Sequence, residues 1–278
     1  MRPDDAFTVI ILAAQRAGRV DPLAAEEGVT HKCLVPLLGA SLIRHVVAAL
    51  VSLPGLTEVR ISVEPEVHEA VMAGLAGLAV PVRLIPSADN LADSVYQASA
   101  DVTGPLIITT ADNVLLTPGA VRRMLAAIGE GADGAVALAT RASVLAAHPE
   151  GQRNFYHFAD DSYSNCNLYA LQGPAAMRLV ESFRTGGQFR RNPMRLITAF
   201  GLFTLLLLRF GRLSLPGAAR RLSRRFRIDM RAVVLPDGSH AIDVDNPRSK
   251  GIAEGLLAKR MPERGSRAMA EREVSRAN

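Results

Sequence analysis

Short apolar runs alternate with helical patterns along the first half of the chain, and this alternation constrains the fold most strongly. Residues Phe7 to Ala13 (FTVIILA) form a continuous apolar run rich in β-branched side chains, which predicts a parallel strand buried on both faces. Pro105 to Thr110 (PLIITT) has the same character, and Gly134 to Thr140 forms a further strand pattern. Helical patterns of about ten to fifteen residues separate such runs, as in βαβ units. We therefore expect an α/β fold, a mostly parallel, doubly wound, Rossmann-like sheet with helices on both faces.

The chain is expected to form one domain. It has 278 residues, and a hydrophobic fraction of 49% allows a sizeable core. We place this domain at 1–261, with an Arg-rich helical insertion at about 184–227. The charged stretch 262–278 is expected to be a disordered tail.

Positive charge is concentrated in one segment. The formal net charge is +5, but the stretch from Arg184 to Arg227 holds eleven arginines and no acidic residue. Without it, 21 basic and 27 acidic residues remain, a balance of −6. This distribution argues against nucleic acid as a partner and favours a local anionic one. Two cysteines, and no pattern of a secretory signal or a membrane span, predict a cytoplasmic protein.

The basic segment contains a run of twelve residues, Ile197 to Leu208 (ITAFGLFTLLLL), in which apolar side chains predominate. This run is too short to cross a bilayer, and a run of this length is more often a core or dimer helix. Flanking arginines also suit a helix that lies in a membrane interface, here at the inner face of the membrane. The region of about 195–227 is thus expected to self-associate or to contact a membrane surface, with an acidic partner as a third alternative.

The loop after the first strand combines small and basic residues. In open α/β sheets, ligands bind beyond the carboxyl ends of the strands, where small residues let backbone N–H groups approach a phosphate. Arg16, Arg19 and Lys32 add three cations, arginine for bidentate contact and lysine as a compact charge. The loop is predicted to bind a phosphate-bearing ligand; an ordinary solvated loop is the alternative.

Carboxylates follow two further strand patterns. Asp112 comes directly after the apolar run that ends at Thr110, so we expect its side chain at the same edge of the sheet as the loop. A late strand is predicted over His240 to Val244, and alternation places Asp243 and Asp245 on one face of it. The alternatives are local: Asp112 can initiate a turn, and the other two can cap the last helix.

Amide and hydroxyl side chains stand near the same predicted edge. Asn165 and Asn167 are two residues apart and share one face of a predicted strand, whereas Cys166 points the other way and is expected to be buried. Asn90 and Ser94 precede the Asp112 strand by one helix. A polar strand edge and a plain helix cap are the alternatives for these two pairs.

Three motifs together resemble a known family. The chain reads L-A-A-Q-R-A-G-R after the first strand, T-H-K-C-L-V-P further on, and D-V-D-N-P before the last helix. They resemble the MobA-like branch of the sugar-phosphate and molybdenum-cofactor nucleotidyltransferases, which open with L-A-A-G-x-G-x-R, continue with P-K and end with D-x-D-T-P. Gln15 stands in place of the first glycine, and His31 in place of the proline before Lys32. Gln15 is then expected to touch the nucleotide through its amide.

The resemblance covers about residues 7–257 and implies a Mg²⁺ site at Asp112 completed by Asp245 or Asp243. Motif position favours Asp245, and Mg²⁺ usually takes one or two carboxylates plus substrate phosphates. Implied catalytic cations are Lys32, Arg16 and Arg19. Nucleotide contacts are implied for Ala13, Ala14, Gln15, Gly18, Asn90 and Ser94, and contacts with the acceptor for Asn165 and Asn167.

The implied reaction is a Mg²⁺-dependent transfer of a nucleoside monophosphate from an NTP, with CTP or GTP favoured, to a phosphorylated small-molecule acceptor. A phosphate oxygen of the acceptor attacks the α-phosphorus in line, and pyrophosphate leaves. One alternative is a nucleotide-sugar-dependent glycosyltransferase, although the mid-chain site reads Ala-Asp-Asn and the D-x-D lies near the C-terminus. The other is a catalytically inactive nucleotide-binding or membrane-associated scaffold.

Overall fold

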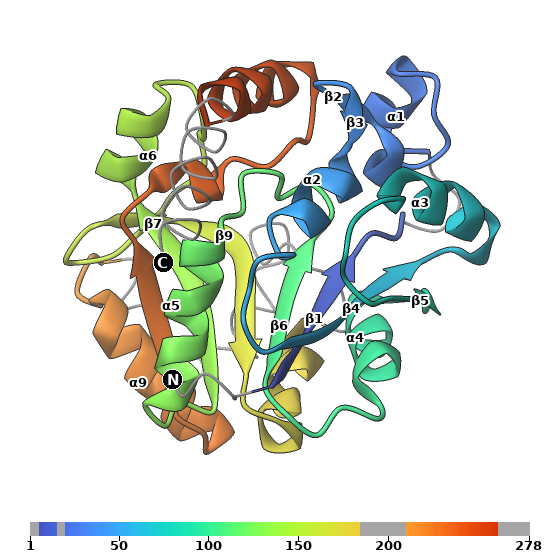
Figure 1. Cartoon of the computed structure of the whole chain (residues 1–278). Coiled ribbons are helices and arrows are strands. Elements are labelled where there is room, and N and C mark those ends of the chain that lie inside the picture. Colours follow the sequence, from blue (N-terminus) through green and yellow to red (C-terminus); the bar gives the residue numbers. More distant parts are fainter. Residues whose placement is uncertain (1–5, 16–19, 184–209, 261–278) are drawn as a thin grey trace, which may run out of the picture.

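A mixed sheet of eight strands forms the centre of the computed structural model, which describes residues 6–15, 20–183 and 210–260 (Figure 1). The strands are β1 (Phe7–Leu12), β4 (Leu56–Val63), β5 (Val82–Pro86), β6 (Leu106–Thr110), β7 (Gly134–Thr140), β8 (Tyr156–His157), β9 (Ser162–Leu171) and β10 (Met230–Leu235). Their order is β10-β7-β9-β6-β1-β4-β5, and β8 pairs with β9. A separate two-stranded ribbon consists of β2 (Pro36–Leu37) and β3 (Ala40–Ser41).

Most neighbouring strands of the large sheet run parallel. β1 is parallel to both β4 and β6, and β10 is parallel to β7. β9 is inserted antiparallel between β6 and β7. The prediction of a mostly parallel α/β sheet is confirmed, and the loops after β1, β6 and β7 open at one edge because parallel strands share their carboxyl ends.

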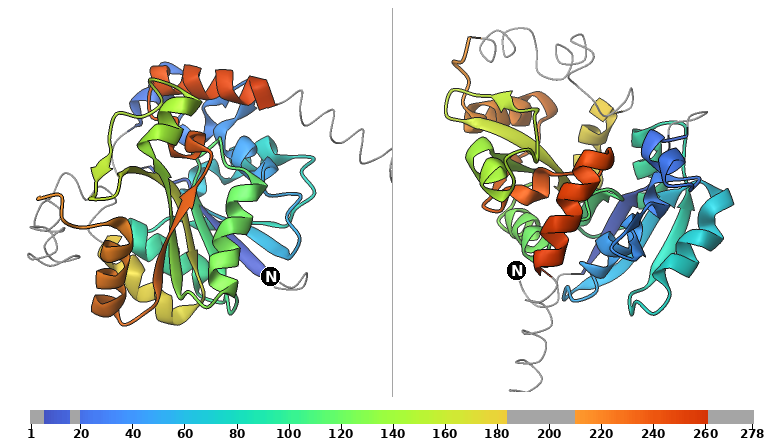
Figure 2. Two further views of the ribbon diagram at one scale, coloured as in Figure 1. Left: turned by 90° about the vertical axis from the view of Figure 1, so that its left-hand side faces the viewer. Right: turned by 90° about the horizontal axis from the view of Figure 1, so that it is seen from above.

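Helices cover both faces of the sheet, as Figures 1 and 2 show. Val9 and Ile11 of β1 belong to one buried cluster and Ile10 to another, so this central strand has no exposed side. The first cluster includes α2 (Leu42–Ala48), α3 (His68–Leu75), α5 (Pro118–Gly129) and the C-terminal helix 247–260. The second includes α4 (Leu91–Ser99) and the 3₁₀ segment η3 (Pro174–Phe183).

The prediction of a late strand over His240 to Val244 is wrong. The chain forms a 3₁₀ turn, η5 (Gly238–Ala241), followed by extended chain outside the sheet. A Cβ on Gly238 would lie 2.1 Å from the backbone nitrogen of Val144, so this close backbone contact admits only glycine. Asp243 and Asp245 consequently do not share the face of a strand.

The basic segment is described only in its second part. Residues 184–209, which include the apolar run, and the tail 262–278 lie outside the described residues. Helix α9 (Leu215–Phe226) packs against β10 and buries Leu215 and Ala218. Arg220 and Arg224 are exposed. Among the described helices, none combines the length and apolar character needed to cross a membrane.

Candidate active site

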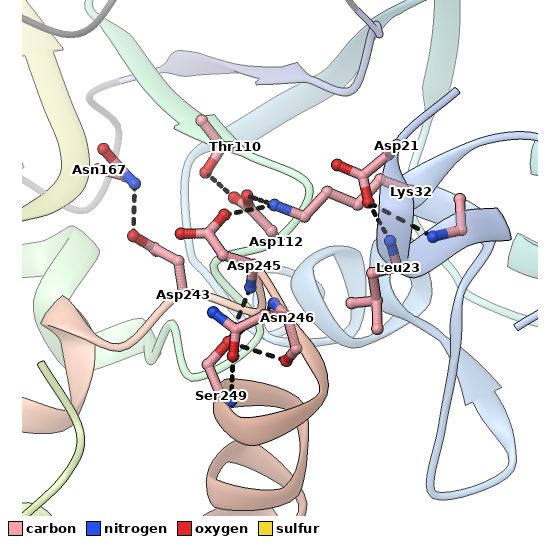
Figure 3. Close-up of polar contacts among 11 residues, drawn as sticks. Asp21, Leu23, Lys32, Thr110, Asp112, Asn167, Asp243, Asp245, Asn246 and Ser249 are labelled. Carbon is pink, nitrogen blue, oxygen red and sulfur yellow. Dashed lines mark hydrogen bonds and ion pairs between the residues drawn. The ribbon is translucent and has the colours of Figure 1, made fainter. Parts of the chain in front are cut away.

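One ammonium group joins two carboxylates that are far apart in the sequence (Figure 3). Lys32 begins the 3₁₀ turn η1 (Lys32–Leu34), Asp112 follows β6, and Asp245 precedes the C-terminal helix. The Lys32 Nζ atom contacts Asp112 Oδ2 and lies 2.6 Å from Asp245 Oδ1. The structure therefore brings together three side chains predicted from separate motifs.

Local contacts hold these carboxylates in place. Thr110 Oγ1 donates a hydrogen bond of 2.5 Å to Asp112 Oδ1, and the Val244 N–H donates to the Asp112 carbonyl at 3.2 Å. Burial lowers the pKa of Lys32, but Asp112 and Asp245 more than offset this, so the pKa is raised above its ordinary value. Lys32 consequently carries its positive charge throughout the physiological range.

Asp243 makes its hydrogen bond to a residue of β9 rather than to Lys32. Asn167 Nδ2 donates to its Oδ2 at 2.7 Å, and Asn165 Nδ2 donates to Asn167 Oδ1 at 2.8 Å. The Oδ1 atoms of Asp243 and Asn165 are buried and have no hydrogen-bond partner among the described residues. Burial, together with the charges of Asp112 and Asp245, raises the pKa of Asp243. Asn165 and Asp243 thus each keep one buried oxygen without a partner in the part of the chain that the structure describes.

The orientation of Asn167 depends on an unusual backbone conformation. Its φ is +45°, in the left-handed region that asparagine tolerates better than most residues. The pairing of β7 with β9 shifts in register between Val136 and Leu138, close to this residue. Cys166 is fully buried as predicted, because the alternation still places it on the opposite face.

The loop after β1 is braced by Gln15. Its amide nitrogen Nε2 donates to the Thr30 carbonyl at 2.8 Å, its Oε1 accepts from the Asp21 N–H at 3.0 Å, and its backbone N–H donates to Glu64. In the structure, the Gln15 amide thus braces the loop, and its predicted contact with the nucleotide stays a prediction. Ala13 is buried and Ala14 is exposed.

Three of the predicted loop residues, Arg16, Gly18 and Arg19, lie outside the described residues.

Asn90 and Ser94 make structural contacts. Asn90 Oδ1 accepts from the Asp93 N–H at 3.0 Å and so caps α4. Ser94 is buried, and its Oγ accepts from the Ala88 N–H at 3.0 Å. Both residues shape the loop after β5, at the same sheet edge as Asp112, and their predicted nucleotide contacts stay predictions.

The C-terminal helix is capped without the side chain of either aspartate of the D-x-D, although the Asp245 N–H donates to Ser249 Oγ at 2.8 Å. Asn246 Oδ1 accepts from the Ser249 N–H at 3.1 Å, and Ser249 Oγ accepts from the Asn246 N–H at 3.2 Å. This reciprocal pair is a capping box, so the alternative in which the side chains of Asp243 and Asp245 cap the last helix is wrong. Both Asp243 and Asp245 are left for other contacts.

The carboxylates suit a metal that accepts few protein ligands. Within 6–15, 20–183 and 210–260, no group of three or more His, Cys, Asp or Glu side chains is arranged to hold a metal. Asp112 and Asp245 nevertheless converge on one cation, the Lys32 ammonium. Two carboxylates facing a substrate-binding edge match the usual requirement of Mg²⁺, whose other ligands are phosphates and water.

Two contributors to the site were missed by sequence reasoning. Thr110 orients Asp112 through a hydrogen bond. The sequence feature that could have identified Thr110 is its place at the end of the predicted strand, two residues before Asp112. Glu64 accepts from Gln15 at 2.8 Å, and its Oε2 lies 3.4 Å from His31 Nε2. No local signal marks Glu64, because its contacts depend on the pairing of β1 with β4.

The model of the MobA-like NTP transferase domain family matches residues 9–179. The chain belongs to this family, which confirms the resemblance drawn from its motifs. It is a nucleotidyltransferase. A comparison with curated proteins gave no match.

Solved structures with the same fold are also nucleotidyltransferases or transferases. A hypothetical transferase from Thermus thermophilus is 26% identical, with a TM-score of 0.68 over 88% of this chain and 99% of that one. CMP:2-keto-3-deoxy-manno-octonic acid synthetase complexed with CTP is 16% identical, with a TM-score of 0.55 over 92% and 99%. A 4-diphosphocytidyl-2C-methyl-D-erythritol synthase from Anaerococcus prevotii is 9% identical, with a TM-score of 0.56 over 91% and 96%. The latter two likenesses concern the fold alone.

Proposed function

We propose that the protein transfers the nucleoside monophosphate of an NTP to a phosphorylated small-molecule acceptor, with Mg²⁺ as cofactor and pyrophosphate as the second product. The observation that carries this proposal is the meeting of Lys32, Asp112 and Asp245 at the carboxyl edge of the sheet. CTP and GTP are the favoured donors. Two proteins of the same fold have cytidine nucleotides in their names, which supports CTP.

Asp112 and Asp245 are the proposed ligands of Mg²⁺. Asp243 is the second candidate for the place of Asp245. When bound there, the metal neutralises charge on the reacting phosphates. Lys32 adds a compact positive charge at the same edge and binds the phosphates of the NTP. Arg16 and Arg19 complete the proposed set of cations, and the backbone of Ala13 and Ala14 lies along the nucleotide.

Asn165 and Asn167 are proposed to hold the acceptor. The unsatisfied oxygens of Asn165 and Asp243 accept hydrogen bonds, so they suit hydroxyl groups of a sugar-like or polyol acceptor. The nucleophile is an oxygen of the acceptor's phosphate, which is already ionised at neutral pH. No basic residue is needed to remove a proton, and positioning supplies most of the catalysis.

The test is pyrophosphate release with each of the four ribonucleoside triphosphates, Mg²⁺ and a pool of phosphomonoesters. The proposal predicts release with one NTP that requires both the metal and an acceptor from the pool. A glycosyltransferase would instead consume a nucleotide sugar and release no pyrophosphate. An inactive scaffold would bind an NTP without turnover, and either result would overturn the proposal.

We further propose that the protein works in the cytoplasm at an anionic membrane surface. Helix α9 buries Leu215 and Ala218 against the sheet and has no acidic residue, so exposed arginines such as Arg220 and Arg224 are its outward groups. Basic residues near an anionic leaflet each contribute about 1 kcal/mol. Self-association through about 195–227 is the competing proposal.

Vesicle sedimentation separates the two. Binding to phosphatidylglycerol vesicles but not to phosphatidylcholine vesicles is expected, and it should weaken in high salt and in R220Q/R224Q. The control R122Q/R123Q removes the same charge from exposed positions of α5. Equal binding by both double variants, or a dimer that does not sediment with vesicles, would contradict membrane contact.

A further inference from the structure

A hollow of about 600 Å³ opens beside β8, the short strand that pairs with β9. It lies between helix α6 (Arg141–Ala147), the loop that follows it and β8. Arg141, Arg153 and His157 line it, and no acidic side chain of the described residues does. Three segments therefore bring groups that carry or can gain positive charge around one space.

The two guanidinium groups of the hollow are available to a ligand. Neither Arg141 nor Arg153 has a side-chain hydrogen bond or ion pair among the described residues. His157 Nδ1 lies 2.8 Å from Ser162 Oγ, a contact that orients the ring of a residue lining the hollow. Unpaired arginines in a hollow favour binding of an anion, because guanidinium matches carboxylate and phosphate oxygens in pairs.

The hollow also has an aromatic wall. The guanidinium carbon of Arg141 lies 6.0 Å from the centroid of the Phe155 ring. Phe155 packs against the main hydrophobic core, so its ring is held from behind. A ligand seated here would meet a charged group and an apolar surface side by side, which suits an anionic group carried on a ring or an apolar body.

The hollow adjoins the acceptor strand. Gln152 Nε2 donates to the Ala241 carbonyl at 3.3 Å, two residues before Asp243, and a Cβ on Gly151 would lie 2.5 Å from Ile242. β8 pairs with β9, which carries Asn165. One wall of the hollow is thus attached to the chain that positions the acceptor residues.

We propose that Arg141 and Arg153, with His157 and Phe155, form a second anion-binding site for a phosphate or carboxylate attached to an apolar or ring-shaped body. This group is either the far end of the acceptor, in which case the inference rests on the proposed function, or a separate anionic effector. The site differs from the phosphate loop after β1 in position and in residues.

The chain contains no tryptophan, so F155W creates a single fluorescent reporter inside the hollow. We expect phenyl phosphate to change its emission saturably without NTP or metal, and neutral benzyl alcohol to leave it unchanged. R141Q/R153Q in the same background should weaken binding about tenfold or more. R122Q/R123Q, which removes two exposed arginines of α5, is the matched control. No saturable change, or equal binding by R141Q/R153Q, would overturn the proposal.

Wild-type protein provides a second readout in case F155W perturbs the site. Phenylglyoxal modifies accessible arginines, and mass spectrometry reports each position. Phenyl phosphate should protect Arg141 and Arg153 but not Arg123, and equal modification of all three with and without it would contradict the site. Transfer kinetics then identify the source: R141Q/R153Q raises the acceptor KM if the acceptor spans the hollow, and leaves it unchanged if a separate anion binds.

Discussion

Arginines near the two ends of the strand order, the β4–β5 end and the β7–β9 end, differ in whether they have acidic partners among the described residues. Arg60 of β4 is 4% exposed, contacts Asp101, donates to Glu58 Oε1 at 2.8 Å and to the Ala98 carbonyl at 2.9 Å. Arg141 and Arg153 line an open hollow without an acidic partner among the described residues. The first arrangement stabilises the fold, whereas the second leaves charge for a ligand.

The polar side chains show the same contrast. Asn90 and Ser94, on the side of β5, use their oxygens to cap a helix and brace a loop. Asn165 and Asp243, on the side of β9, each keep a buried oxygen without a hydrogen-bond partner among the described residues. A buried unpaired oxygen costs about 1–3 kcal/mol, so a ligand that supplies the missing donor gains affinity. The two pairs therefore differ in whether their oxygens already have hydrogen-bond partners among the described residues.

The largest expected effect is a loss of activity on substitution of Asp112, which lies between the β4–β5 and the β7–β9 ends of the sheet. D112N removes a carboxylate that contacts Lys32 and should lower kcat by about 10³-fold, the order seen when a charge-stabilising group is lost. The measurement is the steady-state rate of pyrophosphate release. E69Q makes the same change on the exposed face of α3 and should keep full activity. Near wild-type turnover by D112N would contradict the proposed role of Asp112 in the reaction.

A matched pair at Asn167 tests the acceptor side. N167G and N167A lose the same contact with Asp243, but only glycine adopts a φ of +45° without strain. N167A should therefore be about 1 kcal/mol less stable than N167G in denaturant unfolding. Both variants should raise the acceptor KM more than the NTP KM. Equal effects on the two KM values would show that Asn167 does not distinguish the substrates.

The smallest effect concerns the paired charges of the β4 side. Asp101 accepts from Arg60, and from Arg83 at 2.9 Å, which lowers its pKa from 3.8 to about 2. Because the folded-state pKa is the lower one, this stabilisation is complete above about pH 4 and is lost as the pH falls toward 2.

Thermal unfolding followed from about pH 5 to pH 2 measures this loss. D101N should lose less stability across this range than wild-type protein. D89N removes an exposed carboxylate near β5 and should follow the wild type. Parallel curves for D101N and wild-type protein would show that the Asp101 contacts do not affect stability.

Sequence patterns predicted the parts that depend on local periodicity. The apolar runs of β1 and β6 identified central strands. Asp112 was identified by its place directly after a strand, and Lys32 as a cation of the loop after the first strand. The strand expected over His240 to Val244 failed because the close packing of Gly238 on Val144 arises only in the folded chain. The same limit applied to Gln15, whose bracing contacts come from Thr30 and Asp21.

Which polar side chains find hydrogen-bond partners could not be predicted from the sequence either. Asn90 and Asn165 are the same residue type at the same edge of the sheet. Only their contacts show that the first caps a helix, whereas the second keeps a buried oxygen without a partner among the described residues. The hollow around Arg153 could not be predicted either, because it requires α6, a loop and β8 to come together.

The most direct test of the central claim is to follow an α-³²P-labelled NTP through one turnover with an accepted phosphomonoester and Mg²⁺. Direct transfer predicts that the label joins the acceptor in a stable small molecule, with an equal amount of pyrophosphate and no label on the protein. Label that stays in free nucleotide, or that becomes covalently attached to the chain, would contradict a transfer in which one side of the site holds the nucleotide and the other the acceptor.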